Sequence, residues 1–147
     1  MNHHHGVGSQ AVLVDTSVVW LYLRDDASAR LYDPHLARKT LCISFVTLGE
    51  LHRWATTYRF APSHQLRLDT ALRRYALLPA DRSLARTWAE VICESNERGH
   101  AISHDAAWLA ATARHYNIPL ITHDPDAFRD VPRITLVTEL HSTNNAR

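Results

Sequence analysis

Short apolar runs alternate with helical patterns along most of this sequence, and that order limits the folds open to the chain. The runs, which we expect to be strands, cover residues 10–14, 40–45, 76–78, 118–122 and 134–137. The run at 40–45 lacks a clean alternation of apolar and polar residues, as expected for a parallel strand buried on both faces. Strands alternating with helices predict a three-layer α/β/α fold around a central parallel sheet of four to five strands.

Helical patterns fill most of the segments between these runs. We expect helices over residues 15–24, 28–38, 48–58, 62–75, 81–98 and 103–113. Asp15, Thr16 and Ser17 are good N-cap residues, and Gly99 is a common stop after a helix. In the helix over 81–98 the buried row is expected to be Leu84, Trp88, Val91 and Ser95.

Length and composition indicate one globular domain, which we place at residues 10–140 of the 147. Residues 1–9 contain three successive histidines and resemble a disordered vector-derived leader, and residues 141–147 are expected to be a loose tail. Cys42 and Cys93 lack the Cys-x-x-Cys spacing and are interpreted as buried thiols in a reducing cytosol. No apolar stretch approaches about 18 residues, so we expect a cytoplasmic protein without a membrane partner.

Acidic residues stand where the predicted strands end. Asp15 follows the first strand and Asp124 follows the strand at 118–122, while Glu50 and Asp105 lie in the first turns of two helices. Ligands of open parallel α/β sheets bind beyond the carboxyl ends of the strands. We therefore expect the four acids to lie at one edge of the sheet.

Each acid alone also has a simpler explanation. Asp15 could cap a helix, Glu50 could be a solvated helix residue, Asp105 could complement a helix dipole, and Asp124 could belong to a turn. Taken together they are harder to explain, because converging carboxylates repel each other unless a cation lies among them. Ligands that are all oxygen favour Mg²⁺ or Mn²⁺ over Zn²⁺.

Polar neighbours accompany these acids. The hydroxyl groups of Thr16, Ser17 and Thr122 stand beside Asp15 or Asp124 and could position a water or an outer-shell oxygen. His104 and His123 also adjoin acids, but we expect them to face solvent rather than act as a general base.

The net charge of +1 conceals an uneven distribution. If the acids gather in one place, the rest of the surface carries an excess of positive charge, which suits a polyanionic substrate. Fifteen of the sixteen basic residues are arginines, which bind phosphate well, although a GC-rich genome produces the same bias. The candidates for phosphate contact are Arg59, Arg67, Arg73 and Arg74, which a solvated helix face would explain equally.

Four segments of this chain resemble, in order and spacing, the PIN-domain family. Residues 14–17 (Val-Asp-Thr-Ser) and 43–51 resemble its first half. Residues 105–113 and 119–128 resemble its second half, and the resemblance extends over residues 12 to 137. Length and order together resemble the VapC toxins of bacterial toxin–antitoxin pairs.

This resemblance implies a PIN-like α/β/α fold and a metal-dependent endoribonuclease that hydrolyses RNA phosphodiester bonds. By match, the catalytic acids would be Asp15, Glu50, Asp105 and Asp124. Mg²⁺, with Mn²⁺ as a substitute, would be held by Asp15, Asp105 and Asp124, and by Glu50 through water. The supporting residues would be Thr16, Ser17, Thr122 and Asp126.

The resemblance also implies partners. VapC relatives pair into homodimers, and a cognate antitoxin silences them by covering the acids with its C-terminal segment. The substrate would be RNA, and the sequence does not distinguish transfer RNA, ribosomal RNA and message.

Two other roles keep the fold: a housekeeping RNA-processing nuclease with the same acids, and a non-catalytic RNA-binding protein that retains them. Other classes with an Asp after a parallel strand fail at single positions. A phospho-receiver domain needs a lysine after its last strand, and the only lysine is Lys39. A metal-dependent adhesion site needs serine where Val19 stands, and a haloacid-dehalogenase phosphatase needs aspartate where Ser17 stands.

Overall fold

The computed structural model describes residues 10–140, so the predicted leader and tail lie outside the described residues. Within that range five parallel strands form one sheet in the order β3-β2-β1-β4-β5. The strands are β1 (Ala11–Val14), β2 (Thr40–Ile43), β3 (Ala76–Leu77), β4 (Leu120–Ile121) and β5 (Leu136–Val137). The predicted central parallel sheet is confirmed, and β1 lies at its middle.

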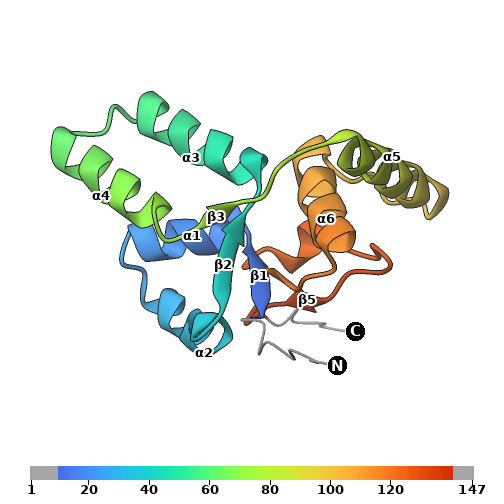
Figure 1. Ribbon diagram of the computed structural model, residues 1–147, viewed down its shortest axis with the longest axis horizontal. Coiled ribbons are helices and arrows are strands. Elements are labelled where there is room, and N and C mark those ends of the chain that lie inside the picture. The colour runs from blue at the N-terminus through green and yellow to red at the C-terminus, as the bar shows by residue number, and fades with distance from the viewer. Residues whose placement is uncertain (1–9, 141–147) are drawn as a thin grey trace, which may run out of the picture.

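Helices cover both faces of this sheet (Figure 1). One face carries α1 (Thr16–Leu23), the 3-10 helix η1 (Ala27–Tyr32), α2 (Asp33–Leu36), α3 (Phe45–Thr57) and α4 (Pro62–Leu72). The other face carries α5 (Arg82–Glu97), α6 (His104–Tyr116) and the 3-10 helix η2 (Pro125–Phe128). The three-layer α/β/α architecture expected from the sequence is therefore present.

The two cores follow from the alternation of side chains along the central strands. Val12 and Val14 of β1 pack into the core beneath α1 and α3, whereas Leu13 packs into the core beneath α5 and α6. In β4, Ile121 and Leu120 divide in the same way. A strand with both faces buried needs apolar residues at successive positions, which explains the unbroken apolar runs.

Several predicted boundaries were wrong for local reasons. The helix expected over 28–38 is instead η1 followed by the single turn of α2. Pro34 lies at the start of α2, where its missing N–H is tolerated; inside a longer helix it would remove a hydrogen bond. β2 ends at Ile43, not residue 45, because the Ser44 hydroxyl accepts the N–H of Val46 and caps α3.

The two cysteines differ in burial. Cys42 is buried as expected, whereas Cys93 is exposed, contrary to the prediction. Cys93 lies two residues after the buried Val91 on α5, which places it about 200° around the helix from the core-facing side.

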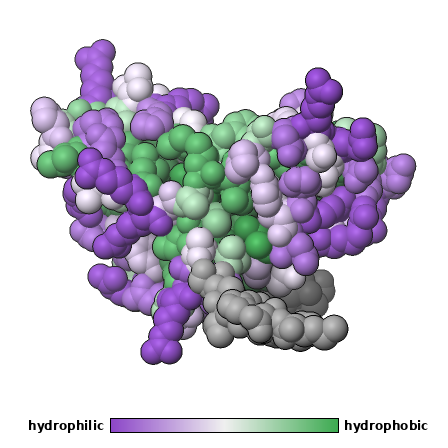
Figure 2. All heavy atoms as spheres, viewed as in Figure 1, coloured by the Kyte–Doolittle hydropathy of each residue, from purple (hydrophilic) through white to green (hydrophobic). Residues whose placement is uncertain are grey.

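The molecule has a hydrophobic centre on the face seen in Figure 2, between hydrophilic surfaces over α3 and α4 on one side and α5 on the other. No helix within residues 10–140 has the length and apolar character needed to cross a membrane.

An ion pair fastens α5 to α6. The carboxylate of Glu94 accepts hydrogen bonds from Arg114 at 2.8 and 3.3 Å and also pairs with Arg133. Burial works to raise the pKa of Glu94, but the two arginines outweigh it and the pKa is lowered. The stabilisation is therefore complete above the ordinary Glu pKa and is lost as pH falls through the lowered value.

We expect Glu94→Ala to lower the free energy of unfolding at pH 7 by about 1.5–3 kcal/mol, because Arg114, only 9% exposed, loses its charged partner. Urea unfolding followed by circular dichroism measures the change. The matched control is Glu97→Ala, an exposed acid on the same helix. Equal stabilities for the two variants would contradict the assignment.

Candidate active site

Asp15 connects β1 to α1 and is 6% exposed. It occupies the N-cap position of α1, yet its side chain makes no capping hydrogen bond. Its Oδ2 instead accepts hydrogen bonds from Ser17 Oγ (2.8 Å) and Thr122 Oγ1 (2.7 Å). The simple capping explanation therefore does not account for this carboxylate.

The electrostatics of Asp15 are unfavourable to its charge. Burial raises the pKa of Asp15 more than its hydrogen bonds with Thr122 and Ser17 lower it, and the negative charge of Asp124 raises it further. A buried carboxylate that keeps its charge needs a cation or strong donors nearby.

Hydroxyl groups tie the turn after β4 to the end of β1. Thr122 is fully buried, and its Oγ1 both donates to Asp15 and accepts the N–H of Asp124 at 3.0 Å. Ser17 Oγ accepts the N–H of His123 at 2.9 Å. The hydroxyls that the sequence places beside the acids thus hold Asp15 and Asp124 at the same edge of the sheet.

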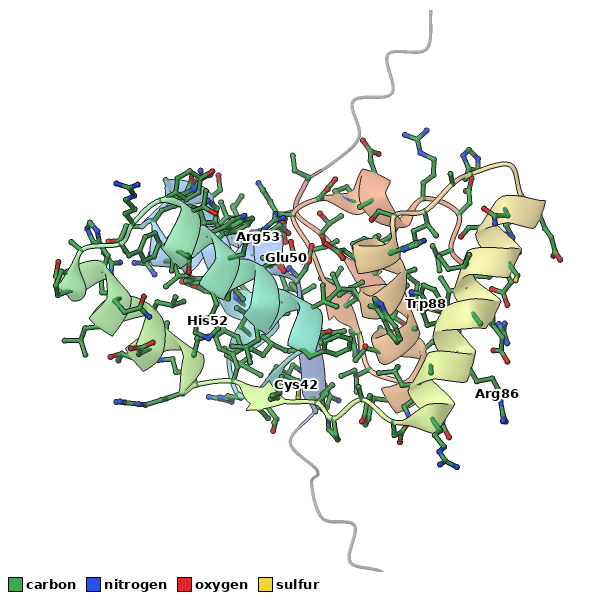
Figure 3. All side chains as sticks on the ribbon, turned by 90° about the horizontal axis from the view of Figure 1, so that it is seen from above. Cys42, Glu50, His52, Arg53, Arg86 and Trp88 are labelled. Atoms are coloured by element: carbon green, nitrogen blue, oxygen red, sulfur yellow. The ribbon has the colours of Figure 1, made fainter. Side chains whose placement is uncertain are left out.

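Glu50 reaches the same edge from α3. Thr16 Oγ1 lies 2.9 Å from Thr47 Oγ1 and 3.3 Å from Glu50 Oε1, which connects the start of α1 to α3. Burial raises the pKa of Glu50, and the charges of Asp105 and Asp15 raise it further. Figure 3 shows Glu50 and Arg53 on one side of α3 and His52 on the opposite side.

The remaining acids lie in two exposed turns. Asp105 is in the first turn of α6, after Ser103 has already capped that helix, and Asp124 precedes η2 without capping it. The charge of Asp105 raises the pKa of Glu50, and the charge of Asp124 raises the pKa of Asp15, so each exposed acid lies near one of the two more buried acids, and Asp15 also acts on Glu50. Asp126 is exposed and pairs with Arg129 at 3.2 Å.

This group has the chemistry of a hard-cation site. None of its four acids forms an ion pair with an Arg, Lys or His within residues 10–140. The donors are all oxygens, which suits Mg²⁺ or Mn²⁺. In the described part of the chain, no three His, Cys, Asp or Glu side chains form a ready-made metal site, so ion binding by these acids stays a prediction.

Two histidines adjoin the acids in different ways. His104 is exposed, as expected, with its ring edge-on to Trp88. His123 is only partly exposed, and its Nδ1 lies 2.6 Å from the hydroxyl of the buried Tyr32. No sequence pattern indicates Tyr32 as a neighbour of the site, because it lies far from the acids along the chain.

The predicted phosphate-binding arginines lie on α4 and at the ends of α3 and α4, where all four are exposed. Arg67 pairs with Asp25 at 3.1 Å, and both Arg67 and Arg74 line a groove between α1, α2 and α4. The arginine whose charge lowers the pKa of Glu50 is Arg53. Its position three residues after Glu50 was the available signal, since such pairs are neighbours on a helix.

A parallel α/β sheet with buried and half-buried carboxylates gathered at its carboxyl edge defines a class of α/β proteins with an acidic site at the strand ends. Residues 12–134 match the family model described as "PIN domain", and the chain belongs to the PIN-domain family. The fold and family predicted from the sequence are confirmed.

The relatives of this chain include VapC proteins. The chain is 30% identical over 118 residues to Ribonuclease VapC5 of Mycobacterium tuberculosis, covering 79% of this chain and 84% of that protein. It also resembles the crystal structure of VapBC-5 from the same organism, with 25% identity, a TM-score of 0.64 and coverage of 87% and 98%. The fold is shared with VapBC2 of Rickettsia felis bound to a promoter DNA fragment, with 21% identity, a TM-score of 0.78 and coverage of 88% and 98%.

Proposed function

We propose that this chain is an endoribonuclease that depends on Mg²⁺ or Mn²⁺ and acts in the cytoplasm as the toxin of a VapBC-type pair. The observation that carries the proposal is the buried Asp15, which forms no ion pair with a cationic side chain within residues 10–140 and whose pKa is raised by burial and by the charge of Asp124. Membership of the PIN-domain family and the similarity to Ribonuclease VapC5 support it.

The residues present fit a divalent cation. Asp15, Asp105 and Asp124 would hold it, with Glu50 contributing directly or through a water. Their oxygen donors suit Mg²⁺ and Mn²⁺. Burial raises the pKa of Asp15 and of Glu50, and neighbouring carboxylates raise both pKa values further, so a bound cation would favour the charged form of each acid. When bound, such an ion lowers the pKa of a water and stabilises the charge that develops on phosphate oxygens.

The chain's own contribution would be positioning. Ser17 and Thr122 both donate to Oδ2 of Asp15 and so fix the orientation of that carboxylate. Thr16 does the same for Glu50 from the side of α1. Arg53, on the Glu50 side of α3, is suited to contact a backbone phosphate of RNA.

We expect the purified chain to cut total cellular RNA in the presence of Mg²⁺ or Mn²⁺, and we expect this cleavage to stop when EDTA is added. Glu50→Gln should lower the rate more than about 100-fold, since changes to mere outer-shell partners already cost about 10–100-fold. The matched control is Asp69→Asn, an exposed acid of α4 hydrogen-bonded to Gln65, which should cut like the parent. Cutting that persists in EDTA would overturn the metal dependence, and the absence of any cutting would overturn the broad ribonuclease proposal.

A toxin differs from a housekeeping nuclease in its effect on cells. Expression of the chain should arrest growth, and Asp15→Asn should relieve the arrest. Growth unaffected by expression would favour the housekeeping role, and arrest that survives Asp15→Asn would favour an RNA-binding protein without catalysis. Sedimentation of the purified chain tests the homodimer that we also propose.

We propose a cognate antitoxin as protein partner, in keeping with the solved neighbours described as VapBC complexes. A groove of about 850 Å³ between α1, α2 and α4 is lined mainly by apolar side chains. Leu66, one of the apolar residues that line the groove, is 63% exposed and therefore accessible to a partner. An apolar segment of the antitoxin is the occupant that we assign to this groove.

A further inference from the structure

Tyr32 joins three segments that lie far apart in the sequence. It is fully buried at the end of η1, and its hydroxyl group donates to the carbonyl oxygen of Thr122 at 3.2 Å. The hydroxyl oxygen of Tyr32 also accepts a hydrogen bond from the backbone N–H of Glu139 at 3.1 Å and lies 2.6 Å from Nδ1 of His123. A buried phenol with three such partners does more than fill space in the core, because a phenylalanine ring would fill the same volume.

Two of these partners belong to the turn that carries Asp124. Thr122 donates through Oγ1 to Asp15, and the backbone N–H of His123 donates to Ser17. The turn is therefore held by two sets of contacts, one from Asp15 and Ser17 at the start of α1 and one from Tyr32 at the end of η1. The His123 ring also meets the Tyr32 ring edge-on, with centroids 5.5 Å apart.

The turn needs such a restraint because of its charge. Asp124 and Asp15 are both acidic and both bind the hydroxyl group of Thr122, Asp15 through Oδ2 and Asp124 through its backbone N–H. Repulsion between them favours movement of the Asp124 turn away from β1, and the hydrogen bonds of Tyr32 oppose that movement. Glu139, whose N–H donates to Tyr32, is held in turn by His35, because its Oε1 lies 2.6 Å from Nε2 of His35.

We propose that Tyr32 is a positioning residue of the proposed nuclease site, whose hydroxyl group holds the turn from Thr122 to Asp124 beside Asp15, the acid that follows β1. The inference rests on the proposed function. Tyr32 would touch neither RNA nor ion and would act through Thr122 and His123. Outer-shell partners of this kind commonly control ion affinity and activity by about 10–100-fold.

The test compares Tyr32→Phe with Tyr116→Phe. Tyr116 also donates its hydroxyl to a backbone carbonyl, that of Pro79 at 2.6 Å, but lies at the opposite end of α6 from Asp105. For Tyr32→Phe we expect kcat to fall about 10–100-fold with KM for RNA unchanged, and the Mn²⁺ concentration for half-saturation to rise by a similar factor. Tyr116→Phe should match the parent in all three quantities.

A second readout does not depend on cleavage. Amide hydrogen exchange at His123 and Asp124, whose N–H groups are bonded to Ser17 and Thr122, should accelerate in Tyr32→Phe and not in Tyr116→Phe. Should Tyr32→Phe fail to fold, His123→Ala removes one partner of the hydroxyl without disturbing the core and should show the same effects in weaker form.

The outcomes separate the two proposals. Normal kcat, Mn²⁺ affinity and amide exchange in a folded Tyr32→Phe would overturn the positioning role. Equal loss of stability in both variants, with the site unaffected, would make Tyr32 a structural residue only. If the parent chain cuts no RNA, the proposed function fails, while Mn²⁺ binding and amide exchange still decide the role of Tyr32.

Discussion

Asp15→Asn is expected to abolish RNA cleavage and, at the same time, to stabilise the ion-free protein at pH 7. The loss of cleavage should exceed about 100-fold, because Asp15 is a direct ligand candidate and not an outer-shell partner. The gain in stability follows from burial, which raises the pKa of Asp15, and from the nearby charge of Asp124. An asparagine removes the buried charge, and its amide oxygen retains the acceptor position for Ser17 and Thr122.

The direction of the change in stability depends on pH. A carboxyl whose pKa is raised on folding binds its proton more tightly in the native state. The free energy of unfolding of the parent chain therefore falls as pH rises from the ordinary Asp pKa to the raised pKa. At every pH above the raised pKa it stays at this lower value. In EDTA the two proteins should unfold at similar urea concentrations near pH 4, and the variant should be the more stable at pH 7.

Two results would contradict the account of Asp15. Cleavage at the parent rate by Asp15→Asn would remove Asp15 from the catalytic acids. A variant less stable than the parent at pH 7 would show that the hydrogen bonds outweigh the buried charge. Asp69→Asn, which changes an exposed acid on α4, controls for the general effect of removing one negative charge.

The sheet was predictable because its central strands obey a simple rule. β1 and β4 pack on both faces, so they require consecutive apolar residues, and a chain of this length has few such runs. The positions of Asp15 and Asp124 followed from the same rule, since residues at the carboxyl ends of parallel strands meet at one edge. Ser17 and Thr122 were predictable as companions because they adjoin those strand ends.

Other features depend on contacts that a linear pattern does not contain. Tyr32 reaches the turn after β4 only through tertiary packing of η1, across 90 residues of sequence to Thr122. The break between η1 and α2 depends on Pro34, whose effect on a helix boundary competes with the helical spacing around it. The exposure of Cys93, by contrast, follows from the predicted row of Leu84, Val91 and Ser95 on α5, which the structure shows buried, and the sequence interpretation of Cys93 did not apply that row.

Leu66→Arg is expected to prevent neutralisation of the chain by its antitoxin while RNA cleavage stays unchanged. Leu66 lies on α4 in the groove shared with α1 and α2, whereas Asp15 and Thr122 belong to the strand ends, and no acid of the candidate site lines that groove. Charged residues, among them Arg67 and Arg74, already line part of the groove, but the substitution replaces an apolar contact by a further charge, which must either lose its hydration or keep an apolar partner segment out. Truncation of a central contact residue costs about 2 kcal/mol or more, which corresponds to a loss of affinity of about 30-fold or more.

Titration of the purified chain with its cognate antitoxin measures the affinity, and inhibition of RNA cleavage by the same antitoxin measures neutralisation. Leu77→Arg is the matched control, because Leu77 lies in β3 outside the groove and its exposed fraction of 51% is similar to the 63% of Leu66. Weakened binding in Leu66→Arg alone assigns the groove to the antitoxin. Unchanged binding in both variants would move the contact to another surface, and the strand-end acids themselves would be the next region to test, because an antitoxin that covers them would block substrate directly.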